Sequence, residues 1–347
     1  MDVGPRKKIV VAPLNWGLGH ATRCIPLVNA LLEANFIPIL ASDGAALTLL
    51  RKEFPSLDYV TLPSYGIKYA KNNRLKWQLF KAIPHCLKAV KKEKEQLAEL
   101  CKHHDIHGII SDNRFGMFHK DIPSVYISHQ LRVLSGATTW LSTYIHQRII
   151  KKFDACWVPD LPTQALSGKM SSSRLTVTYL GVLSRLKKTK SPIKVDILIV
   201  LSGPEPQRSI LEKRLLRLFS ATQQRVVLIR GIFSEQPLPP GPSTLKVVNY
   251  ALKDELEQLM NASEVIISRS GYSTILDLAK LNKKAFFIPT PGQYEQIYLA
   301  KRLHQKGIAP FATQDAFSLA HLRELPKYTG FTQELEEGLP PGLFKLF

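Results

Sequence analysis

A histidine directly after a glycine-rich turn is the first candidate for chemistry in this sequence. Residues 11–23, VAPLNWGLGHATR, carry an apolar run that leads through Asn15, Gly17 and Gly19 to His20. Glycines let the backbone turn sharply towards a ligand, and the N-terminus of a following helix favours an anion. An imidazole at this position can take a proton from a hydroxyl group. We therefore predict His20 as a catalytic base, and Asn15, Gly17 and Gly19 as acceptor-binding residues. The alternative for His20 is a turn residue that only caps the helix.

A second glycine turn lies in residues 264–277, EVIISRSGYSTILD, between an apolar run and a helical pattern. Hydroxyls and backbone N–H groups at such a helix start can bind a diphosphate. Asp277 comes one helical turn after Thr274, so its carboxylate can accept hydrogen bonds from both hydroxyls of a ribose. The alternative is an ordinary capped helix, because Ser and Thr are good N-caps. The donor-binding residues predicted here are Arg269, Ser270, Gly271, Ser273, Thr274 and Asp277.

Polar residues follow three further apolar runs. Glu295 and Gln296 stand at a helix start after KAFFIPTP, where they can bind the hydroxyls of a sugar, although such residues are common in first helical turns. The runs HGIISD and SVYIS end in residues that should face the same side as His20. The alternative for these is a helix cap and a loop histidine. The acceptor-binding residues predicted here are Asp112, Asn113, His129 and Gln130.

Buried strands alternate with amphipathic helical stretches in both halves of the chain, which predicts parallel sheets covered by helices on both faces. The fold class is therefore α/β, with two Rossmann-like, doubly wound domains facing across a cleft where ligands bind. The charged, aperiodic stretch LSRLKKTKSP interrupts this alternation. We predict an acceptor-binding domain over 1–182, a linker over 183–192, a donor domain over 193–325 and an irregular tail over 326–347.

The net charge of +19 on 347 residues is regional, since residues 1–190 hold +15 of it. Residues 64–94 hold nine Lys or Arg and one acid among aromatic and aliphatic side chains, a pattern that suits an anionic membrane surface. A solvated helix face is the alternative, and no nucleic-acid motif is present. We expect a cytoplasmic protein, because the cysteines are scattered, the first apolar run is too short for a signal peptide and no segment is long enough to span a membrane. Peripheral association with the inner face of the membrane is a further expectation.

The stretch SRSGYSTILDLAKLNKKAFFIPTPGQYEQIYLAKRL resembles the donor-binding segment of family 28 glycosyltransferases, which include the peptidoglycan lipid-intermediate GlcNAc transferase and the galactolipid synthases. The loop NWGLGHATR resembles the first glycine-rich loop of the same family. It is also similar to the GxGHxxR start of related predicted glycosyltransferases and UDP-sugar hydrolases. The resemblance implies the GT-B fold and nucleotide-sugar chemistry across both domains.

The resemblance also implies roles for individual residues. His20 matches the proposed base, and Ser270, Gly271 and Thr274 match the diphosphate turn. Asp277 stands where the family usually has a glutamate that binds ribose. Glu295 and Gln296 match a sugar-binding pair, with glutamate as a departure. The remaining donor-binding residues implied are Ser202, Gly203 and Arg208, whose guanidinium would compensate for a phosphate loop that contains two prolines.

Together these features predict transfer of a sugar from a nucleoside diphosphate, expected to be UDP, to the hydroxyl of a lipid-linked or cell-envelope glycan acceptor. The resemblance favours inversion at the anomeric carbon. The donor loops have no DxD-like acidic pair, so we expect no metal and no cofactor, the nucleotide sugar being a substrate. The alternatives are a nucleotide-sugar hydrolase and a non-catalytic protein that binds nucleotide sugars or polyanions.

Overall fold

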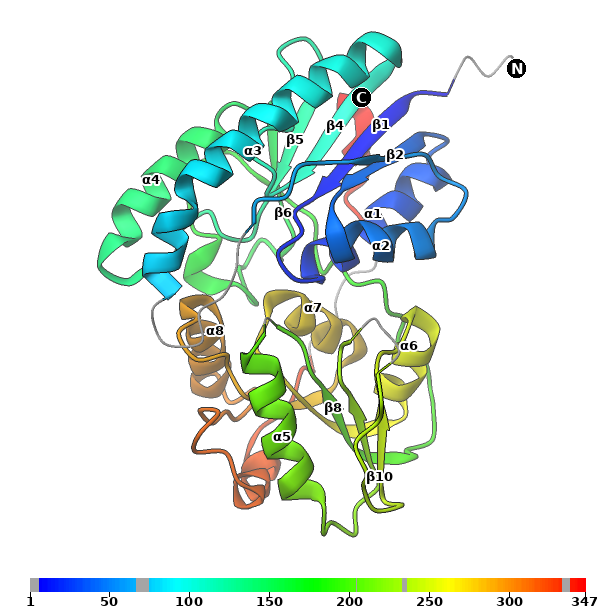
Figure 1. The fold of residues 1–347 in the computed structure, drawn as a ribbon, viewed down its shortest axis with the longest axis vertical. Coiled ribbons are helices and arrows are strands. Elements are labelled where there is room, and N and C mark those ends of the chain that lie inside the picture. The colour runs from blue at the N-terminus through cyan, green and yellow to red at the C-terminus, as the bar shows by residue number, and fades with distance from the viewer. Residues whose placement is uncertain (1–5, 67–74, 204, 233–235, 333–337) are drawn as a thin grey trace. The chain divides into compact units, whose positions relative to one another are not determined.

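Two parallel sheets, each formed from apolar runs of the sequence, organise the computed structural model (Figure 1). They belong to separate compact units, which divide between Ser184 and Arg185, and the C-terminal end of the chain returns to the first unit. All strand pairs among the described residues are parallel. The structure describes residues 6–66, 75–203, 205–232, 236–332 and 338–347, with the backbone alone over 75–82.

The first unit is a seven-stranded sheet with the order β3-β2-β1-β4-β5-β6-β7. Leu97 of α3 packs on one face of this sheet, against Val10 and Ile39, whereas α1 and α2 contact each other and the strands β1 and β2. The elements are β1 (Lys8–Pro13), α1 (Gly19–Glu33), β2 (Ile37–Ser42), α2 (Gly44–Glu53), β3 (Tyr59–Thr61), α3 (Leu75–His103), β4 (Ile106–Asp112), β5 (Ser124–Ile127), η1 (Gly136–Thr138), α4 (Thr139–Ile150), β6 (Ala155–Val158), η2 (Gly168–Met170) and β7 (Thr178–Tyr179).

The second unit is a five-stranded sheet with the order β10-β9-β8-β11-β12. Its core joins strand residues such as Ile199 and Phe286 to Leu215 of α5 and Phe317. The elements are β8 (Val195–Val200), α5 (Gln207–Phe219), β9 (Val226–Ile229), β10 (Leu245–Val248), α6 (Lys253–Asn261), β11 (Ser263–Ser268), α7 (Tyr272–Leu281), β12 (Lys284–Phe287), α8 (Tyr294–Gln305) and η3 (Leu319–Lys327).

Both sheets reverse their strand order at one point, between β1 and β4 in the first unit and between β8 and β11 in the second. At such a point the connections that follow the two neighbouring strands lead to opposite sides of the sheet. The loops at the carboxyl ends of these strands therefore separate and leave room for a ligand. Every loop that the sequence marked for chemistry at β1, β4, β8 and β11 therefore lies at one of these two points.

The structure corrects the sequence analysis at three places. Helix α2 and the two-residue strand β7 were not predicted, because neither has a long apolar run. The C-terminal tail is also less irregular than predicted, since it includes the 3₁₀ helix η4 (Leu343–Leu346). The buried Phe347 packs near Trp157, with 6.2 Å between the ring centroids, and the Lys7 ammonium donates to the Phe347 carbonyl at 2.5 Å. Apolar packing thus orders the end of this chain.

Candidate functional site

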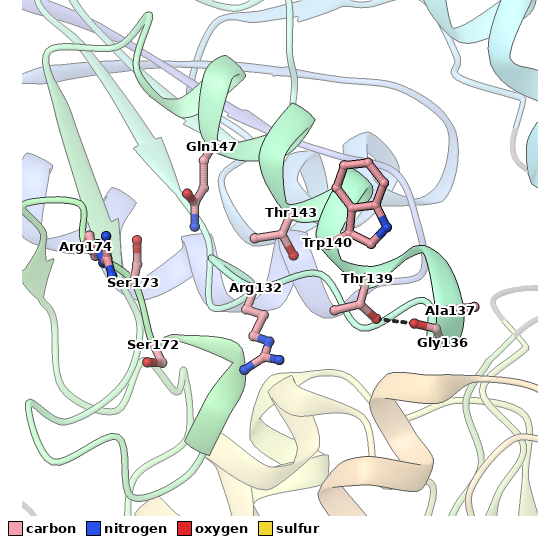
Figure 2. A pocket seen from close by; sticks show the side chains of 10 residues that line it. All are labelled: Arg132, Gly136, Ala137, Thr139, Trp140, Thr143, Gln147, Ser172, Ser173 and Arg174. Carbon is pink, nitrogen blue, oxygen red and sulfur yellow. Dashed lines mark hydrogen bonds between the residues drawn. The ribbon is translucent and has the colours of Figure 1, made fainter.

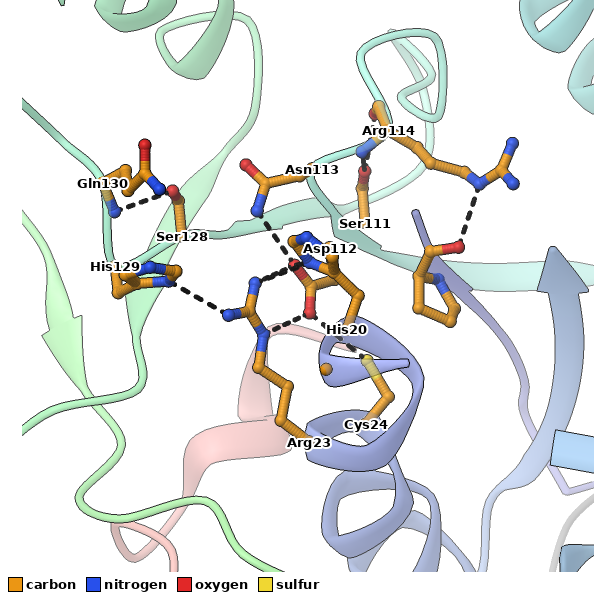
Figure 3. Close-up of polar contacts among 12 residues, drawn as sticks. His20, Arg23, Cys24, Ser111, Asp112, Asn113, Arg114, Ser128, His129 and Gln130 are labelled. Atoms are coloured by element: carbon orange, nitrogen blue, oxygen red, sulfur yellow. Dashed lines mark hydrogen bonds and ion pairs between the residues drawn. The ribbon is translucent and has the colours of Figure 1, made fainter. Parts of the chain in front are cut away.

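The site in the first unit begins with two residues that lie 92 positions apart in the sequence. Asp112 is the last residue of β4 and pairs in register with Pro13, the last residue of β1. His20 lies in the first turn of α1, which follows the β1 loop, and 14% of its side chain is exposed. Its Nδ1 atom lies 2.9 Å from Oδ1 of Asp112. The structure therefore brings the predicted base into direct contact with a predicted acceptor-site residue (Figure 3).

Arg23 completes this contact from the next turn of α1, three residues after His20. Its Nε donates to Oδ2 of Asp112 at 2.5 Å, and its Nη2 pairs with Oδ1 of the same carboxylate. On the other side, Nη1 lies 3.0 Å from Nδ1 of His129. The sequence analysis assigned Arg23 no role, although the spacing of histidine and arginine in GHATR was the signal for it. It is the arginine that neutralises the buried carboxylate.

The environment of Asp112 keeps it ionised. Burial by itself would raise the pKa of this carboxyl, but the charges of Arg23 and His20 and their hydrogen bonds lower that pKa well below its usual range. A permanent carboxylate at Nδ1 favours the imidazole form that carries its hydrogen there and donates it to Asp112. That form leaves Nε2 with a lone pair. Arg23 Nη2 also lies 2.8 Å from Nδ1 of His20. In the other imidazole form, with the hydrogen on Nε2, the Nδ1 atom accepts a hydrogen bond from this Arg23 N–H.

A chain of hydrogen bonds extends from Asp112 towards α4. Asn113, which has a left-handed φ of 60°, donates to Asp112 at 3.1 Å and accepts from the Tyr126 hydroxyl at 2.9 Å. Nε2 of His146 lies 2.9 Å from the same hydroxyl and is an alternative acceptor for its one hydrogen, while Nδ1 of His146 donates to the Gln130 carbonyl at 2.9 Å. Burial lowers the pKa of His146 to about 4, so its imidazole is neutral at pH 7. The predicted residues Asn113 and Gln130 thus belong to a scaffold around Asp112.

The glycine loop after β1 is held by Asn15. The amide of Asn15 donates to Asp43 at 3.1 Å and accepts from the Ala46 N–H at 3.3 Å, so both of its ends are bonded within the protein. Asn15 thus shapes the loop, and its predicted acceptor role stays a prediction. Gly17 has a φ of 74°, which favours glycine, and no atom lies within 4 Å of a Cβ built there. Gly19 begins α1. The loop therefore leaves open space at Gly17, directly before His20.

A second buried charge cluster supports the same loops. Arg114, wholly buried, donates to the Pro13 carbonyl at 3.0 Å and to Glu93 at 2.7 Å, and its Nη2 pairs with Asp43. Burial raises the pKa of Glu93 despite the nearby guanidinium, and Glu93 also accepts from Tyr65 at 2.8 Å. This cluster holds the carboxyl end of β1 against the β4 loop, and the sequence analysis did not identify it.

In the second unit, both of the predicted donor-site arginines bind groups within the protein. Arg269 is buried and donates to the Ile288 carbonyl at 3.0 Å, to the Gln207 carbonyl at 2.9 Å and to Gln314 at 2.6 Å. Burial lowers its pKa to about 10, which still leaves it charged at pH 7. Its guanidinium ties loops together within the protein, and its predicted role as a donor ligand stays a prediction.

Arg208 also forms its ion pairs and hydrogen bonds within the protein. Its guanidinium pairs with Glu212 and Glu205, two carboxylates of or next to α5, and donates to the Arg230 carbonyl at 3.2 Å. A cation that is already paired with two carboxylates has little attraction left for a phosphate. These ion pairs do not favour the predicted compensation for the prolines of this loop, which stays a prediction.

The other predicted donor-site residues, near the carboxyl ends of β8, β11 and β12, have small or polar side chains. Ser270 is buried and its hydroxyl donates to the Gln296 carbonyl at 2.8 Å, whereas Ser273, Thr274 and Asp277 lie half-buried on α7. Gln296 accepts from the Thr290 N–H at 2.8 Å through its side-chain oxygen, and Glu295 is half-buried beside it. Gly271 precedes α7 as its N-cap. Ser202 and Gly203, exposed after β8, complete the predicted set.

Two hydroxyls at this point have no hydrogen-bond partner among the described residues. They belong to Ser268, the last residue of β11, and Thr290, which follows β12, and both oxygens are buried. A Cβ built on Gly203 would lie 3.7 Å from the Thr290 hydroxyl, so the β8 loop approaches the same place. The sequence analysis missed Thr290, whose signal was its position after a buried strand.

The fold of the whole chain is shared with known glycosyltransferases. The glycosyltransferase SnogD from Streptomyces nogalater superposes with a TM-score of 0.62 at 15% identity, over 92% of this chain and 90% of that one. Residues 198–325 match the sequence model of the glycosyltransferase family 28 C-terminal domain. The second half of the chain thus matches family 28 glycosyltransferases in sequence, and the chain has the GT-B fold.

Two curated relatives resemble the chain in sequence. An uncharacterized glycosyltransferase from Methanopyrus kandleri is 21% identical over 89% of this chain and 90% of its own length. The UDP-N-acetylglucosamine–N-acetylmuramyl-(pentapeptide) pyrophosphoryl-undecaprenol N-acetylglucosamine transferase of Sulfurihydrogenibium is 24% identical over 45% of this chain. That second match spans 44% of the relative, less than half of its length.

The predicted membrane segment is described only in part. Residues 67–74 of the stretch 64–94 lie outside the described residues, as do the side chains of 75–82. In the part of α3 with described side chains, Ile83 and Leu87 are 47% and 65% exposed, and Lys88 and Lys91 are exposed next to them. Among the described helices, none is long and apolar enough to span a bilayer. Nor do the described His, Cys, Asp and Glu side chains form a group of three or more that could hold a metal ion.

Proposed function

We propose that this glycosyltransferase moves a sugar from a UDP-sugar to a hydroxyl group of a lipid-linked acceptor, with His20 as the base. The observation that carries the proposal is the 2.9 Å contact between His20 Nδ1 and the permanently ionised Asp112. A carboxylate in that position orients the ring and stabilises the imidazolium that forms when Nε2 accepts a proton. The family model supports transfer, and hydrolysis of the nucleotide sugar is the less favoured alternative.

In the proposed reaction, His20 Nε2 accepts the proton of the acceptor hydroxyl while its oxygen attacks the anomeric carbon. The bond between that carbon and the diphosphate oxygen breaks, and the electron pair leaves with UDP. A single displacement of this kind inverts the anomeric centre. Charge on the leaving diphosphate is stabilised by the N-terminus of α7 with Gly271, Ser273 and Thr274, without a metal ion. Asp277, one turn further on, binds the ribose hydroxyls.

The choice of UDP and of a lipid-linked acceptor is supported by a curated relative and by the exposed side chains of α3. The Sulfurihydrogenibium relative carries both in its name, as UDP-N-acetylglucosamine and pyrophosphoryl-undecaprenol. The exposed Ile83 and Leu87 beside Lys88 and Lys91 suit peripheral binding to an anionic membrane surface, which is where a lipid-linked acceptor would be met.

A donor panel tests this function directly. Purified protein is incubated with UDP-, GDP- and dTDP-sugars, with and without a membrane lipid extract, and both nucleotide release and glycosylated lipid are measured. We expect release from a UDP-sugar that depends on the extract and yields glycosylated lipid. The His20→Ala variant should lose this activity, whereas His104→Ala, which replaces an exposed histidine of the same unit, should keep it. Release of free sugar at full rate without extract would instead establish a hydrolase.

A further inference from the structure

A pocket of about 640 Å³ lies in the first unit, apart from the residues assigned above to the reaction. Its walls are the start of α4 on one side and residues 172–174 on the other, with Arg132 between them (Figure 2). Trp140, on the first turn of α4, is 73% exposed at this pocket. A large aromatic side chain left in solvent next to a cavity provides a surface on which a ligand ring can pack.

The charge of the pocket is entirely positive. Arg132 and Arg174 both line it, and none of the lining residues is acidic. Among the residues that the structure describes, no carboxylate contacts either of these exposed guanidiniums. Arg208 and Arg114, by contrast, are paired with two carboxylates each. Two guanidiniums in one pocket without an acid suit a ligand that carries a phosphate or a carboxylate.

Neutral hydrogen-bonding groups stand beside these arginines in fixed orientations. The Thr143 hydroxyl accepts from the Val133 N–H at 3.1 Å, so its own hydrogen remains for a ligand. Gln147 donates to the Leu131 carbonyl at 3.1 Å, which directs its side-chain oxygen as an acceptor. A donor, an acceptor and an aromatic ring are the groups that bind the hydroxyls and the apolar face of a sugar.

One short loop contributes residues both to this pocket and to the surroundings of His20. Residues 128–132 follow β5, with His129 contacting Arg23 at the His20 site and Arg132 lining the pocket. Three residues of extended chain span at most about 11 Å, so the Cα atoms of His129 and Arg132 lie within that distance. The loop is anchored at several points, since the Arg132 N–H donates to the Met170 carbonyl at 2.8 Å and His146 binds the Gln130 carbonyl.

We propose that this pocket binds an anionic group of the acceptor, a phosphate or a carboxylate attached to a sugar ring that packs on Trp140. Arg132 and Arg174 bind the anion, Thr143 and Gln147 bind the sugar hydroxyls, and the shared loop sets the distance to His20. The inference rests on the proposed function, because it takes His20 as the base that the acceptor must reach. It narrows the acceptor to an acidic glycan or a sugar phosphate.

Binding of small sugars to the purified protein tests the proposal. Glucose 1-phosphate, glucuronate and glucose serve as probes, and affinity is measured by saturation-transfer NMR and titration. We expect one or both anionic sugars to bind at least about tenfold more tightly than glucose. The double variant Arg132→Gln/Arg174→Gln should lose at least about tenfold in that affinity. The charge-matched control Arg51→Gln/Arg148→Gln, two exposed arginines of the same unit, should change it less than twofold.

The two probes separate phosphate from carboxylate as the preferred anion. Equal binding of glucose, equal loss in the control variant, or no binding of either anionic sugar would overturn the proposal. Calorimetry with UDP on the same variants keeps this result separate from the proposed function. If UDP binds normally but neither anionic sugar binds, the pocket proposal alone is refuted. If the wild-type protein binds no nucleotide, the proposed function is refuted, and the sugar titration still tests the pocket.

Discussion

The carboxyl ends of the two sheets differ in how their polar groups are satisfied. At the reversal of the first sheet, Asp112 is buried, charged and bonded to His20 and Arg23. At the reversal of the second sheet, the Ser268 and Thr290 hydroxyls are buried without partners among the described residues. Unpaired buried hydroxyls are costly, and a ligand with acceptor or donor oxygens would satisfy them. The first site thus has the charge pairing that the proposed proton transfer requires, and the second has polar groups that a ligand would satisfy.

Removing the base should have the largest effect on this division of roles. We expect His20→Ala to fold, to bind UDP as before and to lose roughly 10²–10⁴-fold in transfer rate, the usual contribution of a positioned general base. The measurement is the initial rate per folded molecule, with calorimetry of UDP as the control. A variant that keeps more than about a tenth of the rate would make His20 a turn residue.

Removing the carboxylate tests whether the first site is a charge network. Asp112→Asn should leave Arg23 buried without its partner, which should lower the free energy of unfolding by about 3–5 kcal/mol. Chemical denaturation measures this loss. Asp58→Asn, which makes the same change at an exposed position, should alter stability by less than about 0.5 kcal/mol. Equal effects of the two substitutions would contradict the network.

The pH dependence of stability probes the far end of the same network. The unfolded chain protonates His146 below about 6.5, whereas the folded chain does so only near 4. The unfolded state therefore binds more protons than the folded state in that interval. Protonation of His146 should lower the free energy of unfolding by roughly 2–3 kcal/mol as the pH falls from 6.5 to 4. Above pH 6.5 it contributes no pH dependence. His146→Phe should flatten this part of the stability curve, while His104→Phe at an exposed position should not.

The smallest expected effect concerns the second unit alone. Asp277→Ala should weaken binding of a UDP-sugar by about 1.5–3 kcal/mol, because hydrogen bonds to a charged group are lost. Asp315→Ala, at an exposed position of the same unit, is the matched control in the calorimetric titration. If the two variants bind alike, Asp277 is not in the donor site, and the contrast between the two sheet ends would rest on Ser268 and Thr290 alone.

The arginines show where prediction from the sequence stopped. Arg269 and Arg208 stood in the donor loops and were expected to bind phosphate, yet both bind groups within the protein. Arg23, without an assigned role, holds the central carboxylate. An arginine in a loop looks the same in the sequence whether it is paired or free, because its partners come from distant positions. The roles of such side chains therefore required the tertiary structure.

The sequence by itself determined the α/β class, the strands before His20 and Ser270, and the helices that begin at both turns. These features depend on local patterns: apolar runs, glycines and helical periodicity. Only the tertiary structure decided that His20 meets Asp112, 92 residues away, and that Arg132 stands in a pocket with Arg174. The reason is physical: the strand order brings distant loops together, and the charge state and availability of each side chain follow from the neighbours it then meets.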